Sequence, residues 1–455
     1  MNTSALTLPV VTIQHTFAEV IQEIQDGVIA SENFWVSCYK KSETSVHAKI
    51  NAELDEHNRN LVNLTTIEEK GDVEVSVGPT GNYRVTCKSL GIPPTEVVTP
   101  IQEYKDEERS NSTRPHRITA FDVSPDCSRY ATGYLDGTIF LYPTTPFKPP
   151  HKSFLPDTIE TTKTKQQSRP HVAQTTSLKF FPSSRVLLSS GLDFTLTILP
   201  ADLPDPSAQA PSYGARISPA RTMRAHTRMI TDTAIIAVGR NVVSSSLDAT
   251  IKLWDVSSGD VISSITAQGG VSSMSLGDRP PAPPDGEEPT PPIATDAREV
   301  PETSAKVIFG GLENGSFQMF DLGFKKSVYT SPKPSVRSSL SSIVYLQSAN
   351  LLATGSSSGL ISIYDTRSLA TPLTSFRRLD TTVEQMAFRN SLNGEVQLAV
   401  ATSDGLPYIA SVVPEGPSVL TELIGVDCDS VRNVTVRGTD VWCASDDGIV
   451  RRYAL

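Results

Sequence analysis

Two groups of residues in this chain contain the three residue types of a serine hydrolase triad, namely serine, histidine and aspartate. The fuller group contains His226, Ser244, Asp248 and Trp254. The second group repeats the first three residue types at the same spacing, with leucine in place of the tryptophan: His171, Ser189 and Asp193. A serine next to a histidine that an aspartate orients is the arrangement that nucleophilic catalysis needs. The alternative is a structural set, in which buried polar side chains satisfy one another's hydrogen bonds.

Both groups lie within a longer pattern that occurs seven times. Each copy has a short apolar run, small residues, an Asp-Gly-like pair and an alternating run, and the clearest copy is Val242–Asp255. The first residue of the pair falls at Asp136, Asp193, Asp248, Asn314, Ser358, Asp404 and Asp447. Alternation predicts a strand with one buried face, and Asp-Gly supplies the positive φ of a tight turn. The pattern therefore predicts a series of β-hairpins.

The spacing of these pairs matches a known architecture. The shorter steps are close to the roughly 40–45 residues of a four-stranded propeller blade. The small residues and the aromatic residue that ends most copies are typical of WD repeats. We therefore predict an all-β fold: a seven-bladed WD-repeat β-propeller, preceded by a small N-terminal α+β domain. Because the Ser-His-Asp groups recur with the repeat, we interpret them as buried structural sets and predict no catalytic residues.

Proline-rich segments divide the repeats. They lie at about 143–176, 200–221 and 277–305, and each falls within one of the longer steps between repeats. Proline cannot donate a ladder hydrogen bond, so we expect these inserts to be surface loops or disordered. The predicted domains are residues 1–100 for the N-terminal domain and 101–455 for the propeller with its inserts.

The last repeat leaves no sequence for an outer strand, since the chain ends soon after Tyr453. An uncovered strand edge is a liability in a propeller, so we expect a segment around Val97–Lys105 to supply the missing strand. Before that segment, Thr16 and Glu19 form a capping-box pattern that predicts a helix ending at Gly27. Strand-like runs follow it: Phe34–Tyr39, Val73–Val77 and Tyr83–Cys87.

The amino-acid composition limits the classes of partner that this protein is expected to bind. The net charge is −10, which disfavours a nucleic-acid backbone or an anionic membrane surface as the main partner. Residues 1–110 hold 17 acidic and 9 basic side chains, which is either a solvated acidic surface or a docking face for a basic partner. Five cysteines without a C-x-x-C pair fit a reducing compartment, and we see no signal peptide and no membrane span.

Other motifs that could carry chemistry are absent or are explained by the repeat. Gly355–Gly359 satisfies the G-x-S-x-G pattern of a nucleophile elbow, but an alternating strand follows it instead of the required helix. The sequence has no phosphate-binding glycine motif, and its seven histidines form no H-E-x-x-H pair. We therefore predict no cofactor, no metal site and no enzymatic activity.

The sequence resembles a known family beyond the repeat itself. Ala225–Asp255 closely resembles the central repeat of the proteasomal ATPase-associated factor family, and Leu420–Val431 and Ser445–Tyr453 are similar to that family's C-terminal end. Residues Phe34–Cys38 and Phe180–Asp193 are also similar. The proline-rich inserts make this chain longer than we expect for the family.

The resemblance implies a non-catalytic assembly chaperone of the 26S proteasome regulatory particle. Members of the family bind the C-terminal domain of an AAA-ATPase subunit of the base and leave when the base docks on the core particle. The resemblance also implies a location in the cytoplasm and nucleus, and we expect a monomer when the protein is free.

Contact residues are expected on the propeller rim that carries the hairpin turns and the loops leading into each inner strand. We predict that partner-binding residues lie in such loops: Asp427, Asp429, Glu384, Arg228 and Met229. For each of them the alternative is a solvated or loop-capping role.

Two other functions remain open. Tyr364–Arg367 resembles the ending that substrate receptors of cullin ubiquitin ligases use to contact their adaptor. The alternative for this segment is a local turn whose arginine bonds nearby. The third possibility is a generic WD-repeat scaffold in an unrelated complex.

Overall fold

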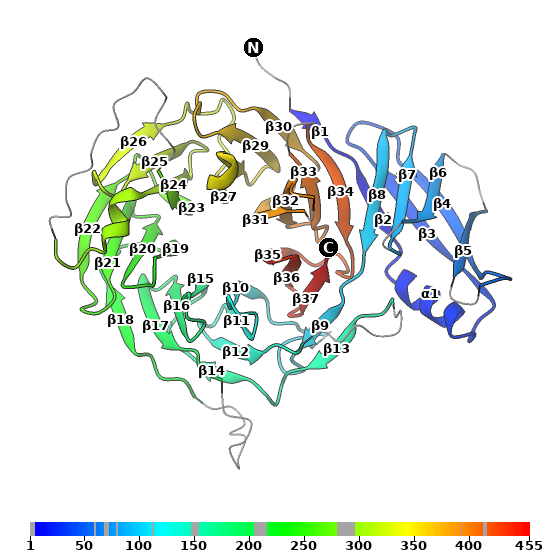
Figure 1. The fold of residues 1–455 in the computed structure, drawn as a ribbon, viewed down its shortest axis with the longest axis horizontal. Coiled ribbons are helices and arrows are strands. Elements are labelled where there is room, and N and C mark those ends of the chain that lie inside the picture. Colours follow the sequence, from blue (N-terminus) through cyan, green and yellow to red (C-terminus); the bar gives the residue numbers. More distant parts are fainter. Residues whose placement is uncertain are drawn as a thin grey trace.

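The computed structural model describes residues 5–58, 61–67, 72–78, 81–111, 113–146, 154–203, 216–279, 296–391, 393–412 and 416–455. In these ranges the chain is almost entirely β-strand, with one α-helix, α1 (Phe17–Gln25), and two short 3₁₀ turns, η1 (Pro301–Ala305) and η2 (Gln347–Ala349). The predicted all-β class is thus confirmed. Figure 1 shows the sheets placed around a central axis, with the N-terminal strands at one side of the ring.

The ring is organised by its innermost strands. Each one contacts the next along the chain, and the last contacts the first, so the contacts form a complete circuit (Figure 1). These strands are β10 (Ile118–Val123), β15 (Thr175–Phe180), β19 (Ile230–Ile236), β23 (Val271–Asp278), β27 (Ser342–Leu346), β31 (Val383–Asn390) and β35 (Val431–Arg437). We number the sheets that begin with them ring sheets 1 to 7, and letter the strands of each a to d from the axis outward.

Ring sheets 1 to 4 are four-stranded antiparallel meanders in the described part of the chain. Ring sheet 1 continues with β11 (Arg129–Tyr134), β12 (Ile139–Pro143) and β14 (Gln166–Ser168). Ring sheet 2 continues with β16 (Val186–Gly191), β17 (Thr195–Pro200) and β18 (Arg221–Arg224). Ring sheet 3 continues with β20 (Asn241–Ser246), β21 (Thr250–Asp255) and β22 (Val261–Thr266). Ring sheet 4 continues with β24 (Lys306–Leu312), β25 (Phe317–Asp321) and β26 (Lys326–Thr330).

Ring sheets 5 to 7 take additional strands from distant parts of the chain. Ring sheet 5 contains β28 (Leu351–Gly355), β29 (Leu360–Asp365), β30 (Thr374–Arg377) and then β1 (Leu6–Thr7). Ring sheet 6 contains β32 (Val396–Thr402), β33 (Tyr408–Ser411) and β34 (Ser418–Leu423), followed by β8 (Ile92–Val98), β7 (Tyr83–Cys87) and β6 (Val73–Val77). Ring sheet 7 contains β36 (Asp440–Ser445), β37 (Val450–Ala454), β9 (Gln102–Lys105) and β13 (Asp157–Glu160).

Strand β21 shows why these sheets stack around the axis. Ile251 and Leu253 share an apolar cluster with Phe320 of ring sheet 4. Trp254, on the opposite face of the same strand, packs with Leu188 of ring sheet 2. Since successive side chains of a strand point to opposite faces, one strand contributes to two cores. Burial of apolar area between adjacent sheets is therefore what holds the ring together.

The predicted closure of the last sheet is confirmed for Gln102–Lys105. Strand β9 pairs antiparallel with β37, and Tyr104 lies opposite Val450. The buried Glu103 carboxylate accepts from Nε of Arg451 at 3.1 Å across this pair. Val97, at the start of the predicted segment, instead belongs to β8 and pairs in ring sheet 6.

The N-terminal region forms one core with its own sheet and with β6–β8. That sheet contains β2 (Val10–Ile13), β3 (Ser31–Tyr39), β4 (Val46–Leu54) and β5 (Val62–Thr66). Helix α1 places Phe17, Ile21 and Ile24 on the core, and the ring of Phe17 lies 5.0 Å from that of Phe34. Strand β8 runs parallel to β34, so the N-terminal core is joined to ring sheet 6 through a continuous sheet.

Two local predictions were only partly right. The helix predicted after Thr16 forms as α1, but Thr16 makes no side-chain capping bond: its φ of −77° and ψ of 4° lie outside the extended conformation of a usual N-cap, and its hydroxyl accepts from Nε2 of Gln14 at 2.9 Å. The first insert is not wholly a loop: β13 and β14 lie within it, because the edges of β9 and β12 accept them as partners. The remaining insert predictions for 147–153, 204–215 and 280–295, including Pro280–Pro292, lie outside the described residues.

Candidate partner-binding surface

One face of the ring gathers the features that the sequence analysis singled out. It carries the b–c turns, between the second and third strands of each sheet, and the d–a loops, which lead into the next inner strand. The two kinds of segment touch: a Cβ on Gly137 of the first b–c turn would lie 2.2 Å from the carbonyl oxygen of His171 in the following d–a loop. A Cβ on Gly405 would lie 2.6 Å from the carbonyl oxygen of Asp429. We call this face the turn face.

The fuller Ser-His-Asp group lies just beneath the turn face and forms one chain of hydrogen bonds. Nε1 of Trp254 donates to the Ser244 hydroxyl at 2.8 Å. The hydroxyl lies 2.7 Å from Nε2 of His226, and Nδ1 of His226 lies 2.7 Å from Oδ2 of Asp248. Because Asp248 accepts at Nδ1, we place the imidazole proton there, so that Nε2 accepts from Ser244. Each polar group in this series of hydrogen bonds thus has a partner.

Burial explains the electrostatics of this group. Desolvation lowers the pKa of His226 below 6.5, although Asp248 acts in the opposite direction. Burial tends to raise the pKa of Asp248, but hydrogen bonds from Thr250 and His226 outweigh it and lower that pKa overall. A neutral imidazole between a hydroxyl and a carboxylate therefore fits the site.

The second group repeats the arrangement in ring sheet 2. Nδ1 of His171 lies 3.0 Å from Oδ1 of Asp193, and Nε2 lies 3.0 Å from the Ser189 hydroxyl. Burial opposes the charge on Asp193, yet the bonds from His171 and Thr195 lower its pKa to about 2. Leu199, in place of tryptophan, gives this group no indole donor.

Neither serine can reach a substrate in this conformation. Ser189 and Ser244 are 0% exposed, and both lie in central strands of their sheets. A nucleophile must contact the reacting carbon, so a hydroxyl enclosed by its own sheet has no access to it. The geometry supports the interpretation of these sets as structural bonds between a d–a loop, a b–c turn and two strands.

The predicted acidic contacts lie on the turn face, in the d–a loop before β35. Asp427 is exposed and Asp429 is half-buried. Among the described residues, no basic side chain lies within ion-pair distance of either carboxylate. Burial, and then repulsion from Asp447 and Asp446, raises the pKa of Asp429. This loop therefore concentrates negative charge at one side of the turn face.

Glu384 is placed differently from the prediction. We expected it in a loop, but it is the second residue of β31 and half-buried. Its Oε1 accepts from Nη1 of Arg432 in the next sheet at 3.3 Å, and Arg432 also pairs with Asp446 at 2.7 Å. The neighbouring Val383 side chain is buried in the apolar core, so β31 already begins there. Glu384 therefore links two ring sheets rather than standing free.

The last two predicted contacts lie in the d–a loop before β19. Arg228 is exposed, and its Nη1 donates to the carbonyl oxygen of Leu247 at 3.0 Å. Met229 is half-buried, and its carbonyl oxygen accepts from the backbone N–H of Leu247. The structure thus brings Arg228 to the surface and uses Met229 partly for packing.

Comparison with known families agrees with this geometry. A family model described as WD domain, G-beta repeat, matches residues 108–142 and 217–255. The chain is a WD-repeat protein. The second match contains the complete His226–Trp254 set, and WD repeats support a role as a protein-interaction scaffold. No curated protein matches the chain.

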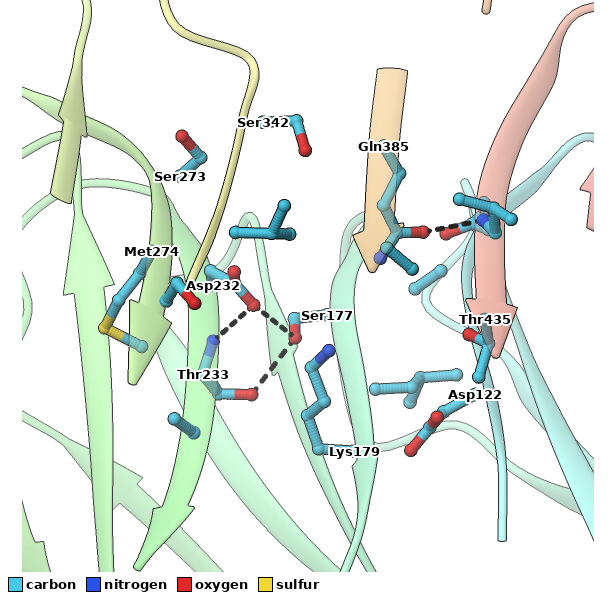
Figure 2. A pocket seen from close by; sticks show the side chains of 18 of the residues that line it. Asp122, Ser177, Lys179, Asp232, Thr233, Ser273, Met274, Ser342, Gln385 and Thr435 are labelled. Atoms are coloured by element: carbon cyan, nitrogen blue, oxygen red, sulfur yellow. Dashed lines mark hydrogen bonds between the residues drawn. The ribbon is translucent and has the colours of Figure 1, made fainter. Parts of the chain in front are cut away.

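The inner strands of this WD-repeat protein enclose a channel of about 890 Å³ (Figure 2). Asp232 accepts from the backbone N–H of Thr233 at 2.8 Å and from the Ser177 hydroxyl at 3.3 Å. Asp122 pairs with Arg437 at 2.8 Å. Burial raises the pKa of Asp232, against the opposing effect of Lys179. The channel wall is polar and internally bonded, and its ionic groups bridge adjacent sheets.

Two motifs that resemble functional sites belong to the WD repeat. Gly355–Gly359 spans the end of β28 and the following b–c turn, so Ser357 lies in a hairpin and precedes no helix. The Arg367 guanidinium makes two bonds to Asp365, at 2.9 Å and 2.6 Å, two residues earlier. That pairing is the local turn we considered as the alternative to an adaptor contact.

The described ranges contain neither a metal-binding cluster nor a helix that could span a membrane. No group of three or more histidine, cysteine, aspartate and glutamate side chains there has an arrangement suited to a metal ion. Within the same ranges, no helix has the length and apolar character to cross a membrane.

Sequence reasoning missed one feature of the turn face. The b–c turns of ring sheets 1 and 2 carry exposed apolar side chains, among them Phe194. Phe194 takes the position that glycine holds in most of the other turns, and this irregularity in the repeat was the available signal.

Proposed function

We propose that this WD-repeat protein is a non-catalytic assembly chaperone of the 26S proteasome regulatory particle base, which binds the C-terminal domain of an AAA-ATPase subunit through the turn face. The resemblance of Ala225–Asp255 and of Leu420–Val431 to the proteasomal ATPase-associated factor family suggests the partner. We interpret the ring sheets as the blades of a seven-bladed propeller, and we place the protein in the cytoplasm and nucleus.

The observation that carries the proposal is the charge of the d–a loop before β35. Asp427 and Asp429 have no ion-pair partner among the described residues, and burial, followed by repulsion from Asp447 and Asp446, raises the pKa of Asp429. Uncompensated charge on a rim attracts a partner of opposite charge and speeds its encounter. A basic surface of an ATPase domain would supply that charge, and covering it would keep the domain from its place in the mature complex.

Co-precipitation of each isolated ATPase C-terminal domain with the purified protein tests the assignment. One domain is expected to bind, and the double variant Asp427→Arg, Asp429→Arg should weaken its binding and flatten the dependence on salt. Arg367→Ala is the matched control, because its guanidinium is exposed and bonded within its own turn. Failure of every ATPase domain to bind would refute the chaperone assignment, and unchanged affinity in the double variant would refute this face.

A further inference from the structure

The turn face has a second feature, on ring sheets 1 and 2. Four apolar side chains project from ring sheets 1 and 2: Leu135 is 53% exposed, Val172 85%, and Leu192 and Phe194 41% each. Leu135 lies in the first b–c turn, Val172 in the following d–a loop, and the other two in the second b–c turn. A cluster of this kind on a soluble protein marks an interaction site. We call these four residues the apolar patch.

Hydrogen bonds between side chains and the backbone hold the segments of the apolar patch together. Nε of Arg169 donates to the carbonyl oxygen of Asp136 at 3.0 Å, which ties the d–a loop to the first b–c turn. The Val172 N–H donates to Oδ2 of Asp193 at 3.1 Å, which ties the same loop to the second turn. Asp193 stands between Leu192 and Phe194 in the sequence. The four side chains therefore project from one continuous, rigid piece of surface.

Phe194 is held in a strained conformation. Its φ is 67°, in the left-handed region that disfavours side chains with a Cβ. The equivalent residue is glycine in five of the other b–c turns, namely Gly137, Gly315, Gly359, Gly405 and Gly448, and is Ala249 in the remaining one. A glycine would relieve the strain, and the exposed ring of Phe194 contributes little to the core. The aromatic side chain is thus explained by contact with something outside the chain.

Two exposed guanidinium groups flank the apolar patch, which also borders the half-exposed Asp136 carboxylate, 3.8 Å from Nη1 of Arg109. Arg169 is exposed and lies in the same d–a loop as Val172. Arg228 is exposed in the next d–a loop, which the repeat geometry places beside the turn of Phe194. Among the described residues, no carboxylate lies within ion-pair distance of either guanidinium. The Asp193 carboxylate is occupied by bonds from His171, Thr195 and the Val172 N–H.

We propose that the apolar patch, flanked by Arg169 and Arg228, is a docking site for a protein segment that presents large apolar side chains next to carboxylates. Apolar side chains would cover Phe194 and Val172, and the carboxylates would pair with the two guanidinium groups. This inference rests on the proposed function in using the turn face. It adds a second contact site, which binds acidic groups of the partner, whereas Asp427 and Asp429 bind basic groups. The partner would then be held at two places on the turn face.

A peptide assay tests the site without the natural partner. The probe is a short fluorescein-labelled peptide in which leucine and phenylalanine alternate with glutamate. Fluorescence anisotropy measures its binding to the protein. The wild-type protein should bind it, and Phe194→Gly, Val172→Ser and Arg169→Glu should each weaken binding by about tenfold. The same peptide with lysine in place of glutamate should not bind. Equal binding of the two peptides, or no binding of either, would overturn the proposal.

Two variants serve as matched controls. Val238→Ser removes a valine that is 81% exposed in the turn between β19 and β20, at the other end of the strands, and should leave peptide binding unchanged. Ala249→Gly changes the equivalent turn position of ring sheet 3 and should also have no effect. Since glycine suits the Phe194 position, Phe194→Gly is expected to stay folded, and its thermal unfolding verifies this before binding is compared.

The assignment of the partner can fail separately from the apolar patch. If an ATPase domain binds the wild-type protein and Phe194→Gly equally well, the patch is refuted while the proposed function stands. If the glutamate peptide binds through the patch and no ATPase domain binds, the patch stands and the proposed function falls. If sedimentation shows that Phe194→Gly converts a dimer to a monomer, the occupant is a second copy of this chain and our proposal is wrong.

Discussion

Nη2 of Arg378 donates to Oε1 of Glu422, in an ion pair whose side chains are only 5% and 4% exposed. The same oxygen accepts from the backbone N–H of Val11 at 3.0 Å, and Nε of Arg378 donates to the carbonyl oxygen of Pro9 at 3.1 Å. Burial raises the pKa of Glu422, while the Arg378 guanidinium opposes that shift. One buried pair thus fastens the N-terminal segment to the junction of ring sheets 5 and 6.

Removing one member of this pair should destabilise the whole protein. Arg378→Ala leaves the Glu422 carboxylate buried without its cation, which should cost about 3–5 kcal/mol in the free energy of unfolding. Chemical denaturation followed by tryptophan fluorescence measures the loss. Arg367→Ala breaks an exposed pair with Asp365 and should change stability little. Similar losses of stability in the two variants would show that the buried pair of Arg378 and Glu422 has no special role.

The two Ser-His-Asp sets should differ in their contribution to stability. Ser244→Ala leaves both the Trp254 indole N–H and Nε2 of His226 without a partner, at a cost of about 2–4 kcal/mol. Ser189→Ala removes a hydroxyl that bonds Nε2 of His171 and the carbonyl oxygen of Thr197 but no indole, so we expect a smaller loss of about 1–2 kcal/mol. Ser264→Ala, at an exposed hydroxyl of β22, is the control. An equal loss in the two repeats would show that the indole contributes nothing.

Stability should also depend on pH through His226. Because burial lowers the pKa of His226 below 6.5, the unfolded chain takes up a proton before the folded protein as the pH falls. The stability advantage of the wild type over His226→Gln should therefore be fully present above the unfolded pKa and shrink as the pH drops through 6.5. Ser264→Ala, which removes no titratable group, is the control and should show no such pH dependence. If the stability difference between the wild type and His226→Gln grew as the pH fell, the predicted direction of the pKa shift would be wrong.

The repeat pattern predicted most of the ring from the sequence. The turn residues from Asp136 to Asp447 all lie in the b–c turns, because Asp-Gly chemistry is local and needs no knowledge of the rest of the fold. The pairing of Gln102–Lys105 with β37 was predicted from a different principle, the need to cover a strand edge.

Contacts between distant segments could not be predicted in this way. Strand β13 pairs in parallel with β9, and its four residues carry no alternating signal. Glu384 bonds to Arg432 in the next sheet, so its place in the structure depends on how two sheets meet. Phe194 was visible in the sequence as a departure from glycine, but its exposure and its φ of 67° give that departure a physical meaning.

From the strain at Phe194 we predict a mutation that does not destabilise the protein, although most substitutions do. Phe194→Gly should leave stability unchanged or raise it by about 1 kcal/mol, because relief of the left-handed conformation offsets the greater freedom of glycine in the unfolded chain. Ala249→Gly, at a φ of 63°, should behave similarly. Gly137→Ala should do the opposite, since its Cβ would lie 2.2 Å from the carbonyl oxygen of His171. Thermal unfolding of the three variants measures these differences. A large loss in Phe194→Gly would mean that its ring stabilises the fold, and the reason for assigning it to a partner would disappear.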